Sequence, residues 1–313
     1  MSLPAPKLDF LAWKLLSLLA ILWGTSFVFM EMVLETGVFG PIAAVFARLL
    51  IGALGLWCFL AIARAPIPTG LSTWRDLAVM GILNNALPFC LIAWGQLWIT
   101  GGLASVLNGM TPIFGVVAAH FLTRDEKMTP ARLAGVVLGF AGVAVLIGPS
   151  VFGELAEHFL GSLAVLGATI SYAFSGLWGK RLASLNPLSA ATGQVSCSAL
   201  IIAPIALWLA EPIPAFDPFD LSITGPLLML GIFSTSLAYI VFFAIIRRAG
   251  GSNVMLVTLM IPAVAVLLGV IVLDETITRG QIEGMALIAL ALLCIDGRLF
   301  SRLRSRRRRQ KQG

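Results

Sequence analysis

Long apolar blocks alternate along this chain with short charged or Gly/Pro-rich segments. A helix rises 1.5 Å per residue, so it needs about twenty apolar residues to cross a hydrocarbon core about 30 Å thick. The blocks therefore predict ten transmembrane helices, at roughly 13–34, 41–63, 76–98, 102–122, 131–149, 160–180, 187–210, 225–246, 251–273 and 280–298. The fold class expected from this pattern is an all-α integral membrane protein.

Composition narrows the class further. Apolar residues make up 59% of the chain and charged residues 12%, against about 45–50% and about 25% in soluble domains. This excludes a soluble globule, and with it a basic nucleic-acid-binding domain. The four cysteines lie inside apolar blocks without paired spacing, so we expect packing roles for them, with no metal site and no cofactor.

The charge of the connecting segments orients the helices. Of the 21 Lys and Arg residues, all except Arg48 and Arg279 fall at the termini or at even-numbered connections. Cytoplasmic segments carry the excess of positive charge, so the sequence predicts a multi-pass protein of the cell inner membrane with both termini in the cytoplasm. The last segment, 299–313, is a basic cytoplasmic tail that can attract anionic membrane lipid.

The first five predicted spans resemble the last five. Pro112 corresponds to Pro262 at an offset of 150, and Trp23 to Tyr172 at an offset of 149. Because each repeat contains an odd number of spans, the second copy crosses the membrane in the opposite direction. We therefore predict two inverted five-helix repeats, 1–149 and 150–298, around a central cavity. Such repeats are typical of transporters that alternate access to a midplane site.

Three segments carry a family resemblance: WGTSF at 23–27, GGLASVLNGMTPIFGVVAAHFLTRDE at 101–126 and IPAVAVLLGVIVLDE at 261–275. In this order, and with their repetition, they resemble the EamA-type branch of the drug/metabolite transporter superfamily, and within it the amino-acid exporters of the YddG type. The resemblance implies a ten-helix exporter of small metabolites. Glu31 departs from it, because the first span of such proteins often ends in a lysine.

Polar side chains gather at one depth of the predicted spans. A polar group costs free energy in lipid unless it faces protein or water, so a shared depth predicts a shared cavity. Packing between helices is the alternative role for each residue. The candidate substrate-binding residues are Trp23, Asn84, Asn85, Thr111, Tyr172, Ser175, Thr235, Tyr239 and Thr258. Pro88, Pro112 and Pro262 are predicted to break their helices and to free backbone carbonyls.

Two charges and one glycine surface leave alternatives open. Glu31 and Arg48 lie inside the first two predicted spans, where a lone charge is costly, so we predict an ion pair between them or exposure to an outer vestibule. The pair could act as a gate or be structural. Gly135, Gly139 and Gly142 form a small-residue surface, suited to close helix packing inside the chain or to a homodimer contact.

These features favour a secondary transporter that exports small metabolites, amino acids first, by alternating access. Amides, hydroxyls and aromatic rings suit a small neutral or zwitterionic solute. A lipid or lipid-linked sugar flippase of the same architecture is the alternative. A membrane-embedded enzyme needs a nucleophile with a base, or clustered acids, at one depth, and the sequence shows none at the midplane. No GxxxxGK[ST] loop for ATP occurs.

Overall fold

A computed structural model describes residues 8–122, 130–147, 158–209, 217–272 and 278–296. Throughout these residues the regular elements are helices, and none is a strand, which agrees with the all-α prediction. The basic tail predicted at 299–313 and the predicted repeat boundary at 149–150 lie outside the described residues.

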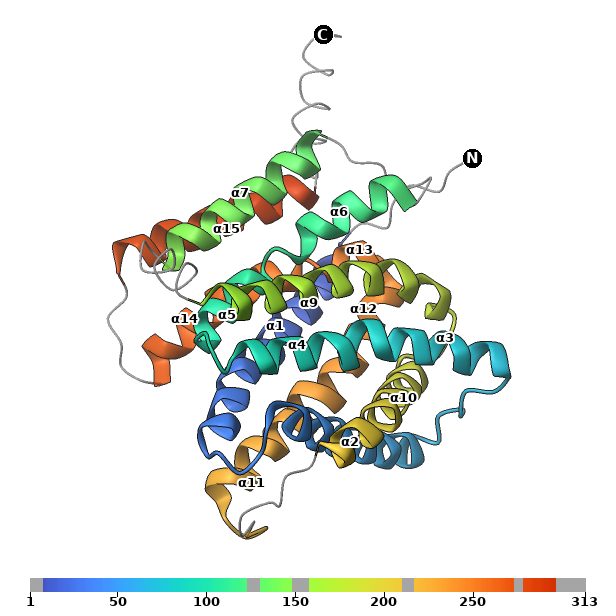
Figure 1. Ribbon diagram of the computed structural model, residues 1–313. Coiled ribbons are helices and arrows are strands. Elements are labelled where there is room, and N and C mark those ends of the chain that lie inside the picture. Colours follow the sequence, from blue (N-terminus) through green and yellow to red (C-terminus); the bar gives the residue numbers. More distant parts are fainter. Residues whose placement is uncertain (1–7, 123–129, 148–157, 210–216, 273–277, 297–313) are drawn as a thin grey trace, which may run out of the picture.

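The helices run in the following order (Figure 1). They are α1 (Phe10–Glu35), α2 (Pro41–Ala63), α3 (Leu71–Gly81), η1 (Ile82–Ala86), α4 (Leu87–Gly95), α5 (Gly101–Asn108), α6 (Thr111–Leu122), α7 (Pro130–Ile147), α9 (Phe159–Trp178), η2 (Gly179–Leu182), α10 (Pro187–Trp208), α11 (Leu221–Leu228), η3 (Met229–Leu237), α12 (Ala238–Ala249), α13 (Gly251–Val254), α14 (Val257–Val272) and α15 (Arg279–Asp296).

The described residues form seven continuous helical segments that are long and apolar enough to cross a membrane. They are 10–35, 41–63, 71–95, 101–122, 159–182, 187–208 and 221–249. The other three predicted spans contain α7, α14 and α15, and the structure describes only part of each of these spans. The chain is therefore a multi-pass membrane protein built from helices.

Polar caps fix where several helices begin. Asp9 accepts a hydrogen bond from the backbone N–H of Ala12 at 2.8 Å and so caps α1. Asn186 caps α10 in the same way, directly before Pro187. The first N–H groups of a helix have no partner within the helix, and a side-chain oxygen at the cap satisfies one of them. Thr100 caps α5 and Asp220 caps α11 in the same way.

Two helices widen into π-helical turns at matching places. η1 joins α3 to α4, and η3 joins α11 to α12. The repeat offset of 150 places 82–86 on 232–236, which lies inside η3. A π turn bonds i to i+5 instead of i to i+4, so it leaves backbone carbonyls without their usual donors. These carbonyls become binding partners for side chains at the site.

The three prolines that were predicted to break helices differ in their position within the helix. Pro88 is the second residue of α4 and follows η1, and Pro112 is the second residue of α6 and follows a break at 109–110. At Pro262 the structure differs from the prediction, because α14 continues past this residue and the break lies earlier, at 255–256. A membrane helix tolerates an internal proline when neighbouring groups satisfy the freed carbonyl.

Helices from the two halves of the sequence pack against each other. Figure 1 shows α7 and α15 side by side at one edge of the molecule. A Cβ atom added to Gly142 would lie 2.8 Å from Leu287 Cβ and 3.0 Å from the Gly284 carbonyl oxygen. Small residues allow such close backbone approach between membrane helices. Gly139 and Gly142 are thus used for packing inside the chain.

Candidate solute-binding site

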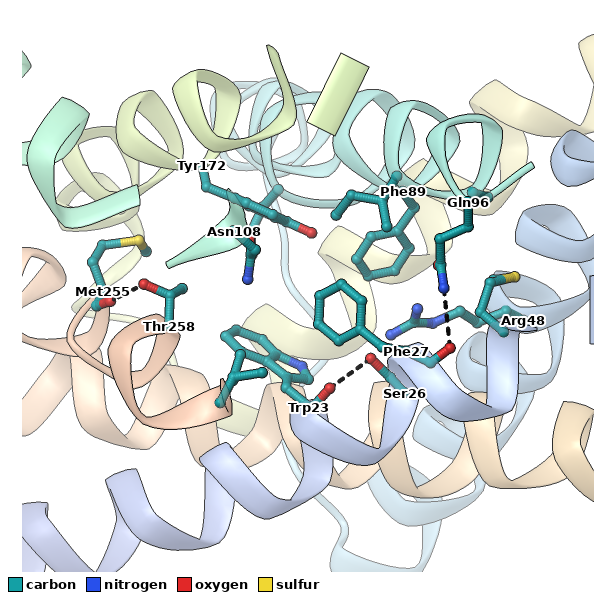
Figure 2. A pocket seen from close by; sticks show the side chains of 15 residues that line it. Trp23, Ser26, Phe27, Arg48, Phe89, Gln96, Asn108, Tyr172, Met255 and Thr258 are labelled. Atoms are coloured by element: carbon teal, nitrogen blue, oxygen red, sulfur yellow. Dashed lines mark hydrogen bonds between the residues drawn. The ribbon is translucent and has the colours of Figure 1, made fainter. Parts of the chain in front are cut away.

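A small cavity lies between helices of both halves (Figure 2). Its lining residues are Trp23, Ser26, Phe27, Met30, Arg48, Asn84, Phe89, Ile92, Ala93, Gln96, Asn108, Tyr172, Met255, Thr258 and Ile261. They come from α1, α2, η1, α4, α5, α9, α14 and the break before α14.

Four of the predicted substrate-binding residues line this cavity: Trp23, Asn84, Tyr172 and Thr258. Trp23 and Tyr172 are equivalent positions of the sequence repeat, and both project into the same space. Asn108 also lines the cavity and was not among the predicted residues, although it corresponds to Thr258 at the offset of 150. The repeat was therefore the signal that could have identified it.

The other predicted residues lie buried around the cavity without lining it. Ser175 donates to Asn84 Oδ1 at 2.9 Å, and Thr111 donates to the Asn108 carbonyl at 2.7 Å. Asn85 Oδ1 accepts from Gln194 at 2.6 Å. Tyr239 and Thr235 also bond to protein groups. Ser175 and Thr111 thus hold lining residues in place through direct hydrogen bonds. Each of the five predicted residues outside the lining bonds to another protein group.

Tyr239 replaces a backbone donor that proline removes. Pro88 has no N–H, so the carbonyl of Asn84, four residues earlier, loses its helical partner. The Tyr239 hydroxyl donates to this carbonyl at 3.0 Å. Both residues are fully or almost fully buried. A side chain of the second half therefore completes the backbone of η1 at the cavity wall.

Carbonyls of both π turns accept side-chain donors. Ser171 donates to the Leu83 carbonyl of η1 at 2.7 Å. In η3, Arg48 Nη2 donates to the Ser234 carbonyl at 3.2 Å, and Arg48 Nε donates to Thr235 Oγ1 at 3.0 Å. Because unpaired backbone groups are costly in a membrane, these contacts stabilise the two irregular turns. They also fix Arg48 at the edge of the cavity.

Arg48 places a positive charge at the edge of the cavity. Only 5% of the residue is exposed. Its guanidinium carbon lies 3.9 Å from the centre of the Phe89 ring, a cation–π contact. Within the described ranges, no carboxylate lies at ion-pair distance from Arg48. The cation is therefore held by neutral groups.

Glu31 has a different partner from the one predicted. Its Oε1 atom accepts from the backbone N–H of Gly101 at 3.4 Å, at the beginning of α5. The positive end of a helix dipole favours a carboxylate there. A Cβ atom at Gly101 would lie 2.7 Å from Glu31 Oε2, so glycine allows the approach. In this structure Glu31 and Arg48 have separate partners.

Several polar atoms at the cavity have no hydrogen-bond partner among the described residues. Trp23 Nε1 and Asn84 Nδ2 are unpaired donors, and Gln96 Oε1 and Asn108 Oδ1 are unpaired acceptors. All four residues line the cavity. An unsatisfied buried polar atom costs about 1–3 kcal/mol. The residues that line the cavity thus keep two buried donors and two buried acceptors without partners.

Two stretches of the chain, 11–148 and 159–295, each match the EamA-like transporter family. The chain belongs to this family. It is a transporter and not an enzyme. In the part of the chain that the structure describes, no group of three or more His, Cys, Asp or Glu residues is placed to hold a metal ion.

Named relatives agree with the EamA assignment. An "Uncharacterized transporter" of Archaeoglobus fulgidus is 27% identical over 289 residues, covering 90% of this chain and 98% of that protein. The "Probable amino-acid metabolite efflux pump" of Escherichia coli is 27% identical over 282 residues, covering 88% and 91%. A solved structure described as "Crystal structure of protein" has a TM-score of 0.73 at 20% identity, covering 93% and 97%, and so shares the fold.

An aromatic cluster of this EamA transporter lies behind Trp23. The Trp23 ring centre lies 5.8 Å from that of Tyr239 and 5.5 Å from that of Phe242. Phe242 also contacts Phe243, with ring centres 5.3 Å apart. Phe242 and Phe243 are buried in α12. Edge-to-face and tilted contacts of this kind pack rings densely, so this cluster supports Trp23 from the side of α12.

Proposed function

We propose that this protein is a secondary transporter that exports small metabolites, amino acids first, by alternating access to the cavity. The observation that carries the proposal is the matched lining: Trp23 and Tyr172, and Asn108 and Thr258, come from equivalent positions of the two halves. The Escherichia coli relative is named as an amino-acid metabolite efflux pump. A cavity shared by two related halves is the arrangement that rocking transporters use.

The architecture proposed for this function is ten spans in two inverted halves, 1–149 and 150–298. The contacts between helices support it because they occur in matched pairs. In one matched set, α4 packs on α9, and the equivalent helices α12 and η3 pack on α1. In the other, α6 packs on α9, and its equivalent α14 packs on α1. The equivalent pairs α2–α10 and α7–α15 also touch. A two-fold axis between the halves would generate this pattern.

The cavity is proposed to open toward the outer side of an inner membrane, with both termini cytoplasmic. On α1 the lining residues run from Trp23 at the middle to Met30 near the end predicted to be external, and Gln96 lies at the corresponding end of α4. The buried Phe242 and Phe243 lie on the other side, toward Arg247 and Arg248 at the end of α12. The arrangement suits an outward-facing conformation closed by aromatic side chains.

Transport is proposed to follow the solute gradient without proton coupling. A proton-coupled carrier usually places a titratable carboxylate at the substrate site, and the lining residues contain none. Glu31 is outside the lining and binds the start of α5. The partners expected are therefore a small solute and membrane lipid.

Flux in proteoliposomes tests the proposal. The purified protein is reconstituted, loaded with each standard amino acid, and efflux is followed with and without an imposed pH gradient, with protein-free liposomes as control. We expect saturable efflux of at least one amino acid, unchanged by the pH gradient. Movement of fluorescent lipid or lipid-linked sugar without amino-acid flux would support the flippase alternative. Accumulation against the solute gradient, driven by pH, would contradict uncoupled export.

A further inference from the structure

Arg48 is a buried cation without a counter-charge. It is 5% exposed and lines the cavity, and the acceptors that it binds, Thr235 Oγ1 and the Ser234 carbonyl, are both neutral. A guanidinium keeps its positive charge in proteins. Burial of an unpaired charge is costly unless another group neutralises it. If Arg48 only held η3 in place, it would not need a charge, because a neutral amide side chain can donate to the same two oxygens.

The guanidinium also retains unused donors. An arginine side chain has five N–H groups in one plane. Arg48 uses one on Nε and one on Nη2, and the other three have no acceptor in the described part of the chain. The guanidinium carbon lies over the Phe89 ring, 3.9 Å from its centre, and this cation–π contact uses the ring face and not the remaining N–H donors. This geometry suits a carboxylate, which binds a guanidinium through two parallel hydrogen bonds.

Neighbouring donors face the same space. Asn84 Nδ2 and Trp23 Nε1 are buried at the cavity without partners. In Figure 2 the hydroxyl of Tyr172 points into the cavity that Trp23 and Arg48 also line. Figure 2 shows Asn108, whose Oδ1 is an unpaired acceptor, on the opposite side of the cavity from Arg48. The residues around this one cavity therefore carry hydrogen-bond donors, a positive charge and a hydrogen-bond acceptor.

We propose that Arg48 binds a carboxylate of the transported solute, so that the substrates are amino acids and other small carboxylates, whereas the corresponding amides and amines are not substrates. The inference rests on the proposed transport function. The solute carboxylate supplies the missing counter-charge of Arg48, and Phe89 holds the guanidinium in plane for it. The ammonium group of an amino acid then lies toward Asn108.

Matched ligand pairs test this subsite. Counterflow in proteoliposomes is measured for each standard amino acid, and for the fastest one also for its primary amide and for the acid that lacks the amino group. We expect the wild-type protein to prefer the amino acid over its amide by about tenfold or more, the effect of a hydrogen-bonded charge pair. The acid without an amino group should compete with the amino acid.

Variants separate substrate binding from a structural role. Arg48→Gln should abolish the preference for acid over amide, whereas Arg48→Lys should keep a weaker preference because it keeps the charge. Thr235→Val is the matched control, because it removes a neutral partner of Arg48 and leaves the guanidinium, so the preference should persist. Thermal unfolding confirms that each variant is folded, and if Arg48→Gln does not fold, the comparison of Arg48→Lys with Thr235→Val decides.

The outcomes distinguish this inference from the function on which it rests. Equal transport of the acid and the amide by the wild-type protein, or an unchanged preference in Arg48→Gln, overturns the carboxylate subsite and leaves amino-acid transport standing. An unchanged preference in Arg48→Lys overturns it as well if Arg48→Gln cannot be measured. Absence of flux for every amino acid and amide overturns both the subsite and the proposed function.

Discussion

The Tyr239 hydroxyl donates a hydrogen bond to the backbone carbonyl of Asn84 at 3.0 Å, the carbonyl that Pro88 leaves without a helical donor. Tyr239 belongs to α12, and Asn84 belongs to η1 in the other half of the sequence. The contact therefore joins the two halves beside the cavity. It also explains how a proline can follow a π turn inside a membrane without leaving an orphaned carbonyl.

Tyr239→Phe should destabilise the protein through this one bond. The Asn84 carbonyl stays buried but loses its donor, at a cost of about 1–3 kcal/mol. Chemical unfolding in detergent measures the change. Pro88→Ala restores an N–H in the helix, so Tyr239→Phe should cost less in that background. An equal cost in both backgrounds would mean that the hydroxyl does not replace the proline's missing donor.

Exchange of Glu31 and Arg48 should not restore function. Their partners differ, because the carboxylate binds the start of α5 and the guanidinium binds η3 and Phe89. Glu31→Arg places a positive charge against the positive end of a helix dipole, which is unfavourable. Amino-acid flux is measured for Glu31→Gln, Arg48→Gln and the exchanged double variant Glu31→Arg/Arg48→Glu. Recovery of flux in the double variant above both single variants would show that the two charges pair during transport.

Gly142→Ala should weaken the packing of α7 against α15. Its Cβ atom would lie 2.9 Å from the backbone nitrogen of Ile288 and 3.0 Å from the Gly284 carbonyl oxygen, and backbone atoms cannot move aside locally. We expect a loss of about 1–3 kcal/mol, the usual cost of overpacking.

Gly115→Ala in α6 is the matched control, since nothing lies within 4 Å of the added atom. Removal of a glycine from a helix should leave stability unchanged or raise it by about 0.5–1 kcal/mol. Thermal unfolding in detergent compares the two variants. Equal effects would contradict the close contact between α7 and α15.

The ion pair between Asp9 and Arg248 at the beginning of α1 predicts that the stability of the folded protein depends on pH. Hydrogen bonds from Arg248 and from the Ala12 N–H lower the pKa of the Asp9 carboxyl from 3.8 to about 2. A lowered pKa in the folded state means that the stabilisation is complete above about pH 4 and is lost as the pH falls toward 2.

Asp9→Asn keeps the side-chain oxygen that caps α1 but removes the charge. Between pH 4 and pH 2 the stability of the variant should therefore fall less than that of the wild-type protein. The unfolding midpoints of the two proteins, measured at both pH values, give this difference. High salt should reduce the same difference, because the pair is exposed and screened. An identical pH profile for both proteins would contradict the role of the pair.

Local patterns were sufficient to predict the helices, because in a membrane each backbone must satisfy its own hydrogen bonds and apolar length determines where a helix can lie. The predicted spans 41–63 and 102–122 differ from α2 and from α5 with α6 by at most one residue at either end. The repeat likewise brought Trp23 and Tyr172 to one cavity. The sequence could not predict the break between α13 and α14 at 255–256, since no proline or charge marks that position.

By itself, the sequence determined the helical membrane class and the two matched halves, because these depend on length, periodicity and repetition along one chain. Only the tertiary structure decided which polar atoms face the cavity and which bind protein. Asn84 lines it and Asn85 does not, because neighbouring residues of one helix point in different directions. The partners of Glu31 and Arg48 depend on α5 and η3, which meet them only after the helices pack.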